Sequence, residues 1–118
     1  NSRKVPVEVI VNGYAVAEKQ VIADGSMQHL EFDLDITESS WIAVRILPSA
    51  HTNPVFVEVG GKPIRASRRS AEWCMKAVDT CWESKKGQIE DRDQKAAKLA
   101  YDQAKEIYRG ILAETKSL

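Results

Sequence analysis

The chain has 118 residues with equal numbers of acidic and basic side chains, so its formal net charge at pH 7 is zero. This length suits one ordinary domain, or a small sheet with a helical appendage, and is enough to bury roughly two-thirds of the unfolded surface. Nucleic acids and anionic membranes usually bind a basic surface, and the neutral charge therefore gives no general reason to expect either partner. The hydrophobic fraction of 43% and the charged fraction of 29% exclude a disordered or fibrous chain.

The apolar segments are too short for a membrane span. The longest, residues 41–47, is interrupted by Arg45 and is far shorter than the ~20 residues that a spanning helix needs. We therefore expect no membrane insertion. The first residues lead into a strand-like run without an apolar stretch, so no signal peptide is expected in this sequence.

Short strands are predicted in the first half of the chain. Valines alternate with other residues from Val5 to Val11, and Asn12-Gly13 is the strongest short signal for a β-hairpin. The return strand, residues 14–22, carries polar residues on both faces, Glu18 and Gln20 on one and Lys19 on the other, and is predicted to be exposed or at an edge of the sheet. Residues 30–36 alternate between apolar and acidic side chains, which predicts a strand with one buried face.

The most apolar segment, residues 41–47, is predicted as the central strand. A polar loop, residues 48–54, leads to a strand at 55–59, and the turn at 60–63 is followed by a short extension, Ile64-Arg65. The total is five or six strands with a turn every eight to twelve residues, a spacing typical of a sandwich or Greek-key sheet.

From Ser67 onward the apolar residues recur every three and four positions, which predicts amphipathic helices. The first begins at a cap, Ser67 or Ser70, and ends at Gly87, where we expect a left-handed terminator. The second begins near Asp91, whose carboxylate is expected to cap the first amides. The apolar stripes are, in the first helix, Ala71, Cys74, Met75, Val78, Cys81 and Trp82, and, in the second, Ala97, Ala100, Ala104, Ile107, Tyr108, Ile111 and Leu112.

Strands followed by helices predict an α+β fold. We expect an antiparallel, β-sandwich-like sheet of five to six strands in residues 1–66. A C-terminal antiparallel helical hairpin in residues 67–118 follows it, because the short connection makes the two helices neighbours. The hairpin and the sheet are predicted to pack together as one domain.

The two cysteines, Cys74 and Cys81, are seven residues apart in the first predicted helix. This spacing separates their Cα atoms by about 10 Å and excludes a disulfide between them. We expect both to be buried as small apolar side chains. A catalytic cysteine would need an exposed thiolate beside a base, and nothing in the sequence places a base there.

Two residues of the polar loop, His51 and Asn53, are candidates for ligand binding because loops on a rigid scaffold often carry binding groups. The alternative is an ordinary rigid loop in which these side chains bond to backbone groups. Zinc requires three or four ligands, and the chain has only two histidines and two cysteines. We therefore expect no metal, no cofactor and no catalytic residue.

Three arginines, Arg65, Arg68 and Arg69, cluster at the start of the first predicted helix, where positive charge opposes the helix dipole. One interpretation is pairing with acids, since Glu72 lies four residues after Arg68. The other is a bound anion, held by the guanidinium groups and the free amides of the helix start.

The aromatic residues Trp41 and Trp73 also permit two interpretations. Exposed aromatic rings on a sheet domain can stack on sugar rings. Large rings more often fill the seam between a sheet and a covering helix, and we expect this role for both.

Two stretches of the chain resemble a known family. SSWIAVRILPSAHTNPVFV (39–57) and GKPIRASRRSAEWC (61–74) are similar to the C-terminal region of CehA/McbA-family metallohydrolases, which are PHP-type (polymerase and histidinol phosphatase-like) proteins. The resemblance spans about Val5 to Trp82. In that family, hydrolysis belongs to an N-terminal domain built around histidines and carboxylates, and none of those motifs occurs here. The resemblance implies a C-terminal accessory domain of a larger chain, whose partner is the N-terminal hydrolase domain, and an exported location.

The leading functional prediction is therefore a non-catalytic accessory domain that docks on a hydrolase domain. One alternative is a carbohydrate- or anion-binding module that uses His51, Asn53, Arg65, Arg68 and Arg69. Another is a unit that self-associates through its helices into a homo-oligomer. Enzymatic activity of this chain alone is not expected.

Overall fold

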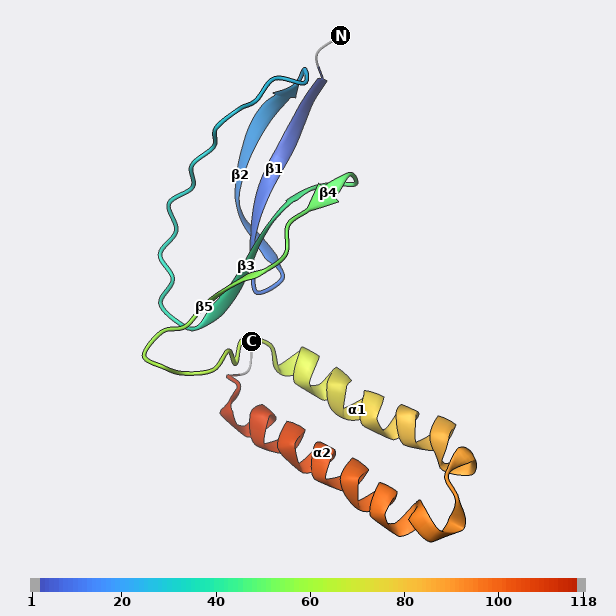
Figure 1. The fold of residues 1–118 in the computed structure, drawn as a ribbon. Helices are drawn as coiled ribbons and strands as arrows, with labels where there is room; N and C mark the ends of the chain where they lie inside the picture. Colours follow the sequence, from blue (N-terminus) through green and yellow to red (C-terminus); the bar gives the residue numbers. More distant parts are fainter. Residues whose placement is uncertain (1–2, 117–118) are drawn as a thin grey trace. The chain divides into compact units, whose positions relative to one another are not determined.

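The computed structural model describes residues 3–116. They form five strands followed by two helices, which confirms the predicted α+β class (Figure 1). The chain divides between Ile64 and Arg65 into two compact units. We call residues 3–64 the sheet unit and residues 65–116 the hairpin unit. Packing of the two into one domain stays a prediction.

The sheet unit contains one antiparallel sheet in the strand order β2-β1-β3-β4, with β5 also pairing with β3. β3 pairs with three strands, β1, β4 and β5, and is the central strand, while β2 pairs only with β1 among the described strands and is an edge, as predicted. The five strands form a single sheet, so the predicted sandwich is not confirmed. The strands are β1 (Arg3–Val11), β2 (Tyr14–Ala23), β3 (Ser40–Ile46), β4 (Ala50–His51) and β5 (Val55–Val57).

The predicted hairpin turn at Asn12-Gly13 is confirmed. Both residues have positive φ, 51° and 94°, as a two-residue turn between twisted strands requires. The Asn12 side chain also accepts a hydrogen bond from the Trp41 N–H and donates one to Ser40 Oγ, each at 3.1 Å. The same residue therefore turns the chain and ties the β1–β2 hairpin to the start of β3.

The most buried side chains of the sheet unit lie on β1, whose second half pairs with β2 on one side and β3 on the other. Val9 and Ile10 are both buried although they are neighbours and point to opposite faces. Between them the register with β2 shifts, so that Val16 has no partner on β1. Both faces of β1 are covered at this point.

Residues 30–36 do not form the predicted strand. Their side chains alternate between half-buried and exposed, as the sequence pattern indicates, but the backbone pairs with no strand of residues 3–116. Figure 1 shows this stretch as an extended trace between β2 and β3. A sequence pattern fixes the face of each side chain and leaves the hydrogen-bonding partner open.

The turn predicted at residues 60–63 is present, with Gly60 and Gly61 at positive φ. Buried Ser39 holds it, since its Oγ accepts a hydrogen bond from the Val59 N–H at 2.8 Å and donates one to the Lys62 carbonyl at 2.6 Å. The predicted extension at Ile64-Arg65 is not a strand.

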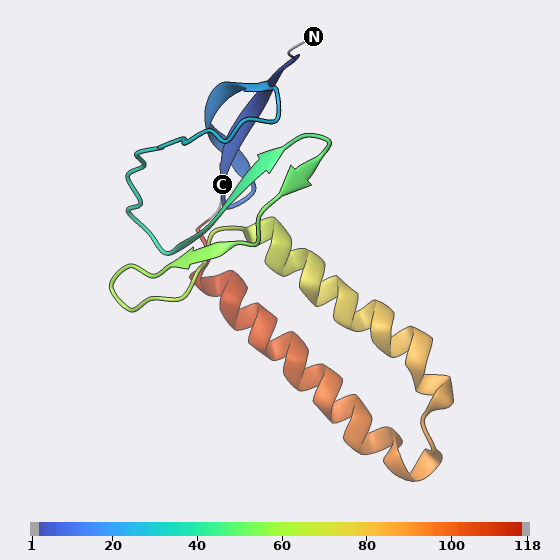
Figure 2. The same ribbon diagram turned by 45° about the horizontal axis from the view of Figure 1, so that its top comes forward.

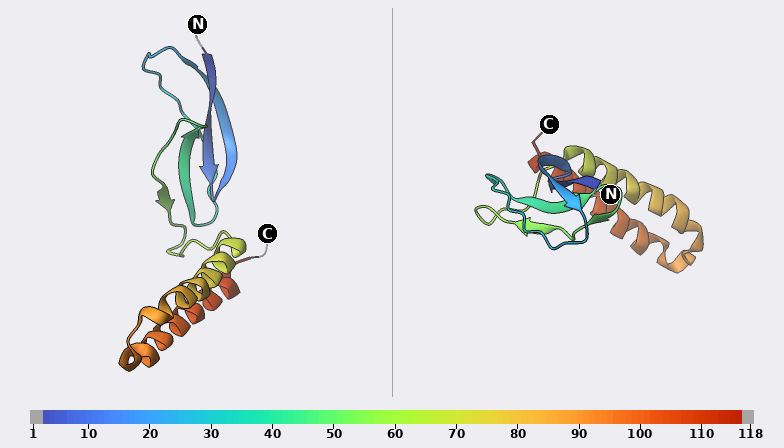
Figure 3. Two further views of the ribbon diagram at one scale, coloured as in Figure 1. Left: turned by 90° about the vertical axis from the view of Figure 1, so that its right-hand side faces the viewer. Right: turned by 90° about the horizontal axis from the view of Figure 1, so that it is seen from above.

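The hairpin unit consists of α1 (Arg68–Lys85) and α2 (Gln94–Glu114), which run side by side in opposite directions (Figures 2 and 3). Two short 3-10 turns, η1 (Lys86–Gln88) and η2 (Asp91–Asp93), connect them. The predicted hairpin and the predicted cap are confirmed, because Ser67 Oγ accepts a hydrogen bond from the Ser70 N–H at 3.1 Å.

Two details at the helix ends were predicted wrongly. Gly87 does not adopt the left-handed conformation but lies inside η1, where a 3-10 turn continues the first helix. Asp91 makes no capping hydrogen bond, because the chain enters α2 through η2 and the cap position passes to Asp93, which makes none either. In both places a short 3-10 turn stands where a left-handed glycine or a capping side chain was expected.

Candidate interaction surfaces

The two predicted ligand-binding residues of the sheet unit, His51 and Asn53, are exposed to solvent. His51 is exposed and belongs to β4, which pairs with the end of β3, so part of the predicted loop is strand. Its Nδ1 lies 3.0 Å from the Thr52 carbonyl. Asn53 is exposed as well. This geometry is that of the ordinary loop, in which a polar side chain bonds to backbone.

Two of the three predicted arginines are occupied in ion pairs within the hairpin unit. Arg68 pairs with Glu72 at 3.3 Å, as the spacing predicted, and also donates to the Leu112 carbonyl at 3.3 Å. Arg65 pairs with Glu114 at 2.7 Å. Arg69 is exposed and forms no ion pair with any residue in the described range. The first two thus link the start of α1 to the end of α2, and binding of an anion stays a prediction.

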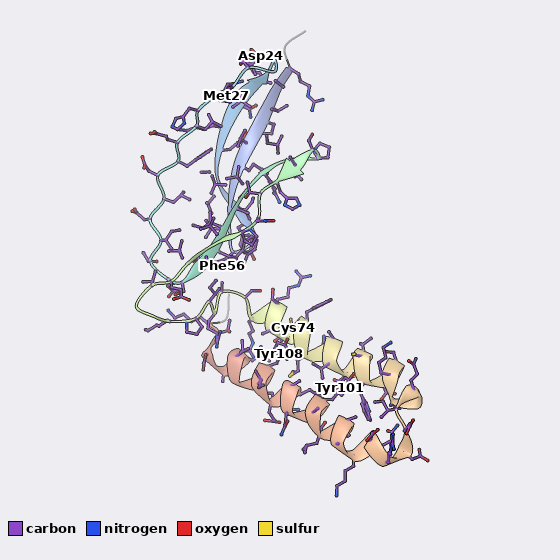
Figure 4. All side chains as sticks on the ribbon, viewed as in Figure 1. Asp24, Met27, Phe56, Cys74, Tyr101 and Tyr108 are labelled. Atoms are coloured by element: carbon purple, nitrogen blue, oxygen red, sulfur yellow. The ribbon has the colours of Figure 1, made fainter. Side chains whose placement is uncertain are left out.

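An apolar groove lies along the seam of the two helices, with a volume of about 430 Å³. Figure 4 labels three of the residues that line it, Cys74, Tyr101 and Tyr108. Small side chains give it depth, and Trp73 forms one edge with 70% of its surface exposed. The groove is lined by Trp73, Cys74, Ala77, Val78, Cys81, Ala100, Tyr101, Ala104 and Tyr108.

Several side chains of the hairpin unit that were predicted to be buried are exposed. Trp73, Cys81, Ala100 and Ile107 are exposed, although each was expected inside. The apolar stripe of each helix is wider than one neighbouring helix can cover, so that only its middle is shielded. There Trp82 packs against Tyr101 with ring centroids 5.2 Å apart. The cysteines are free, as predicted.

Inside the groove, Cys81 Sγ lies 3.3 Å from the Tyr101 hydroxyl. This hydrogen bond, with a smaller contribution from burial, raises the pKa of Tyr101 above its ordinary value near 10. The neutral phenol is the favoured form in the folded chain. The stability that this hydrogen bond gives the folded chain is therefore complete below pH 10, and it is lost as the pH rises through the raised pKa of Tyr101.

Substituting Cys81→Ala is expected to return the pKa of Tyr101 towards 10, because the hydrogen bond is lost. A pH titration of the Tyr101 ring by NMR measures this shift. Cys74→Ala is the matched control, since Cys74 lines the same groove and makes no hydrogen bond to Tyr101. An equal pKa of Tyr101 in both variants would show that the hydrogen bond from Cys81 does not raise this pKa.

The second uncovered surface is an open edge of the sheet unit, formed by β2 and residues 27–37. On β2, Tyr14, Val16 and Ile22 are exposed. Lys19 extends from β2 to the neighbouring segment, donates to the Glu31 carbonyl and places its Nζ 5.1 Å from the centre of the Phe32 ring. Gln28 Nε2 donates to the Ile22 carbonyl at 2.6 Å. Side chains, and no backbone ladder, hold the segment beside β2.

Comparison with protein families, with curated proteins and with solved structures gives no match for this chain. Residues 3–116 bring together no group of three or more His, Cys, Asp or Glu side chains suited to a metal ion. Neither helix of the described chain has the length and apolar character that crossing a bilayer requires.

Proposed function

We propose that this chain is a non-catalytic accessory domain of a larger protein and docks on a hydrolase domain through its uncovered apolar surfaces. The resemblance to CehA/McbA-family proteins motivates the partner. The observation that carries the proposal is the amount of apolar surface that both units leave exposed, which includes Phe56 and Val55 on the sheet unit and Trp73 and Ile107 on the hairpin unit.

The total surface area supports this interpretation. The chain has a solvent-accessible area of 9246 Å² at a mass of 13.2 kDa. Two separate compact proteins of half this mass would expose about 7,700 Å² together. The chain therefore exposes more surface than two separate compact proteins of this mass would, whether or not its two units contact each other. The large accessible area and the exposed large apolar side chains together support a surface that another polypeptide covers.

The test begins with the gene region that encodes the residues before Asn1. The proposal predicts a hydrolase domain there, rich in histidine and carboxylate motifs. Expressed as a separate polypeptide, that domain should bind the 118-residue chain and raise its melting temperature, because a ligand of the folded state stabilises it. An upstream region without such motifs, or a hydrolase domain that leaves the melting temperature unchanged, contradicts the proposal.

Self-association through the hairpin unit is a second candidate, favoured by the groove. The 18 residues of α1 make a face about 27 Å long, and two helices side by side are about 20 Å wide. Because protruding side chains add to the flat area of such a face, its accessible area approaches the ~800 Å² per partner that a stable dimer buries. A second copy seated there would cover Trp73 and the other residues that line the groove, and would complete a four-helix bundle.

Sedimentation equilibrium of the full chain tests this candidate. A dimer that Trp73→Ser disrupts and Leu99→Ser leaves intact supports it, because Leu99 is also exposed on the hairpin unit but does not line the groove. A monomer at high concentration, or equal effects of both substitutions, counts against it.

A further inference from the structure

The backbone of residues 27–37 has the hydrogen-bonding groups of a strand without a ladder. None of their N–H groups donates to any group of residues 3–116, and the Glu31 carbonyl is occupied only by the Lys19 side chain. In folded proteins nearly all buried backbone groups are paired, and an exposed strand edge is a ready template for another strand. Eleven such residues in a row make an edge about 36 Å long when extended.

The side chains of this segment are already sorted as in a strand with two different faces. Leu30, Phe32, Leu34 and Ile36 are half-buried, while Glu31, Asp33 and Asp35 between them are exposed. No residue from 3 to 116 forms an ion pair with Asp33 or Asp35, and Glu31 has only His29 at 3.1 Å. One face is therefore apolar, and the other carries three carboxylates, of which Asp33 and Asp35 form no ion pair with residues 3–116.

We propose that residues 27–37 are the docking edge for an extended strand of the partner protein, in which apolar residues alternate with lysine or arginine. The added strand would supply the missing backbone ladder. Its apolar side chains would extend the row of Leu30, Phe32 and Leu34, and its basic side chains would lie opposite Glu31, Asp33 and Asp35. Directly opposed charges of opposite sign stabilise a strand pair, and like charges destabilise it.

The occupant is a polypeptide strand because the unsatisfied groups are backbone N–H groups in an extended row, which only another extended backbone matches along its whole length. The charge pattern determines which side chains the partner strand carries, because three carboxylates on one face favour basic residues and disfavour acidic ones. This inference rests on the proposed docking function and adds a strand edge to the exposed apolar surfaces that motivate it.

A short peptide of alternating valine and lysine is the probe, added to the full 118-residue chain and followed by amide hydrogen exchange. We expect it to slow exchange at alternate amides of residues 27–37, because every second N–H of a strand faces one neighbour, and a peptide of alternating valine and glutamate to bind about tenfold more weakly. The double substitution Asp33→Lys with Asp35→Lys should reverse this preference. Both positions are exposed, so the fold should tolerate the change.

A peptide of the same valine and lysine content, with the lysines grouped in a block, controls for general charge attraction. Equal protection by the alternating and the grouped peptides, or no protection of residues 27–37 by either, would overturn the proposed edge. Binding of the hydrolase domain without protection of residues 27–37 would also overturn it while leaving the docking function in place, since docking would then use another surface.

Discussion

Replacing Ile10 with alanine is expected to lower the free energy of unfolding of the sheet unit by about 3 kcal/mol. Ile10 is only 4% exposed and sits on β1, between β2 and β3. Its truncation removes buried apolar surface and leaves a cavity, and both terms are unfavourable. A unit of about 60 residues is only marginally stable, so this loss can unfold it.

Urea unfolding of the full chain, followed by exchange of the β1 amides, measures the effect. Ile22→Ala is the matched control, because it removes the same atoms from β2 at a position that is 43% exposed. We expect it to cost less than about 1 kcal/mol. Equal losses at the two positions would mean that β1 does not carry the core of the sheet unit.

Leu112→Ala is expected to destabilise the hairpin unit by about 2–4 kcal/mol. Leu112 is 9% exposed, near the end of α2, and its carbonyl accepts the hydrogen bond from Arg68. Helices of 18 and 21 residues gain most of their stability from packing and little from intrinsic propensity. Loss of the buried Leu112 side chain should therefore melt both helices together.

Circular dichroism during thermal unfolding checks this prediction. Leu99→Ala makes the same chemical change on the same helix at a position that is 59% exposed, and we expect a loss of less than about 0.5 kcal/mol. A similar fall in helix stability in both variants would place the packing of α2 elsewhere.

Local signals in the sequence predicted much of the fold. The Asn12-Gly13 dipeptide defined the first hairpin, and Ser67 defined the start of α1, because each acts through neighbours within a few residues. The apolar run at 41–47 identified the central strand, since a strand with partners on both sides is covered more than an edge.

The errors arose where the outcome depends on distant residues. The alternation in residues 30–36 predicted the faces correctly, but no local pattern can say whether a partner strand is present. In the same way, the spacing of Arg68 and Glu72 predicted their ion pair, whereas the pairing of Arg65 with Glu114 joins residues 49 apart and could not be foreseen.

The candidate surfaces were only partly predictable. The helical period places Trp73 on a different face from Cys74 and Met75, which is compatible with its exposure, yet large rings are usually buried. The groove beside it depends on how α1 and α2 approach each other, and this is a property of packing. The resemblance to CehA/McbA-family proteins and the choice of partner stay predictions.

Hydrogen exchange of residues 27–37, measured in the 118-residue chain alone and with the proposed hydrolase domain attached, tests the central claim most directly. If this chain is a docking domain with an open strand edge, these amides exchange rapidly in the chain alone, and alternate ones become protected when the hydrolase domain is attached. Strong protection in the isolated chain, or rapid exchange in both, would contradict the account.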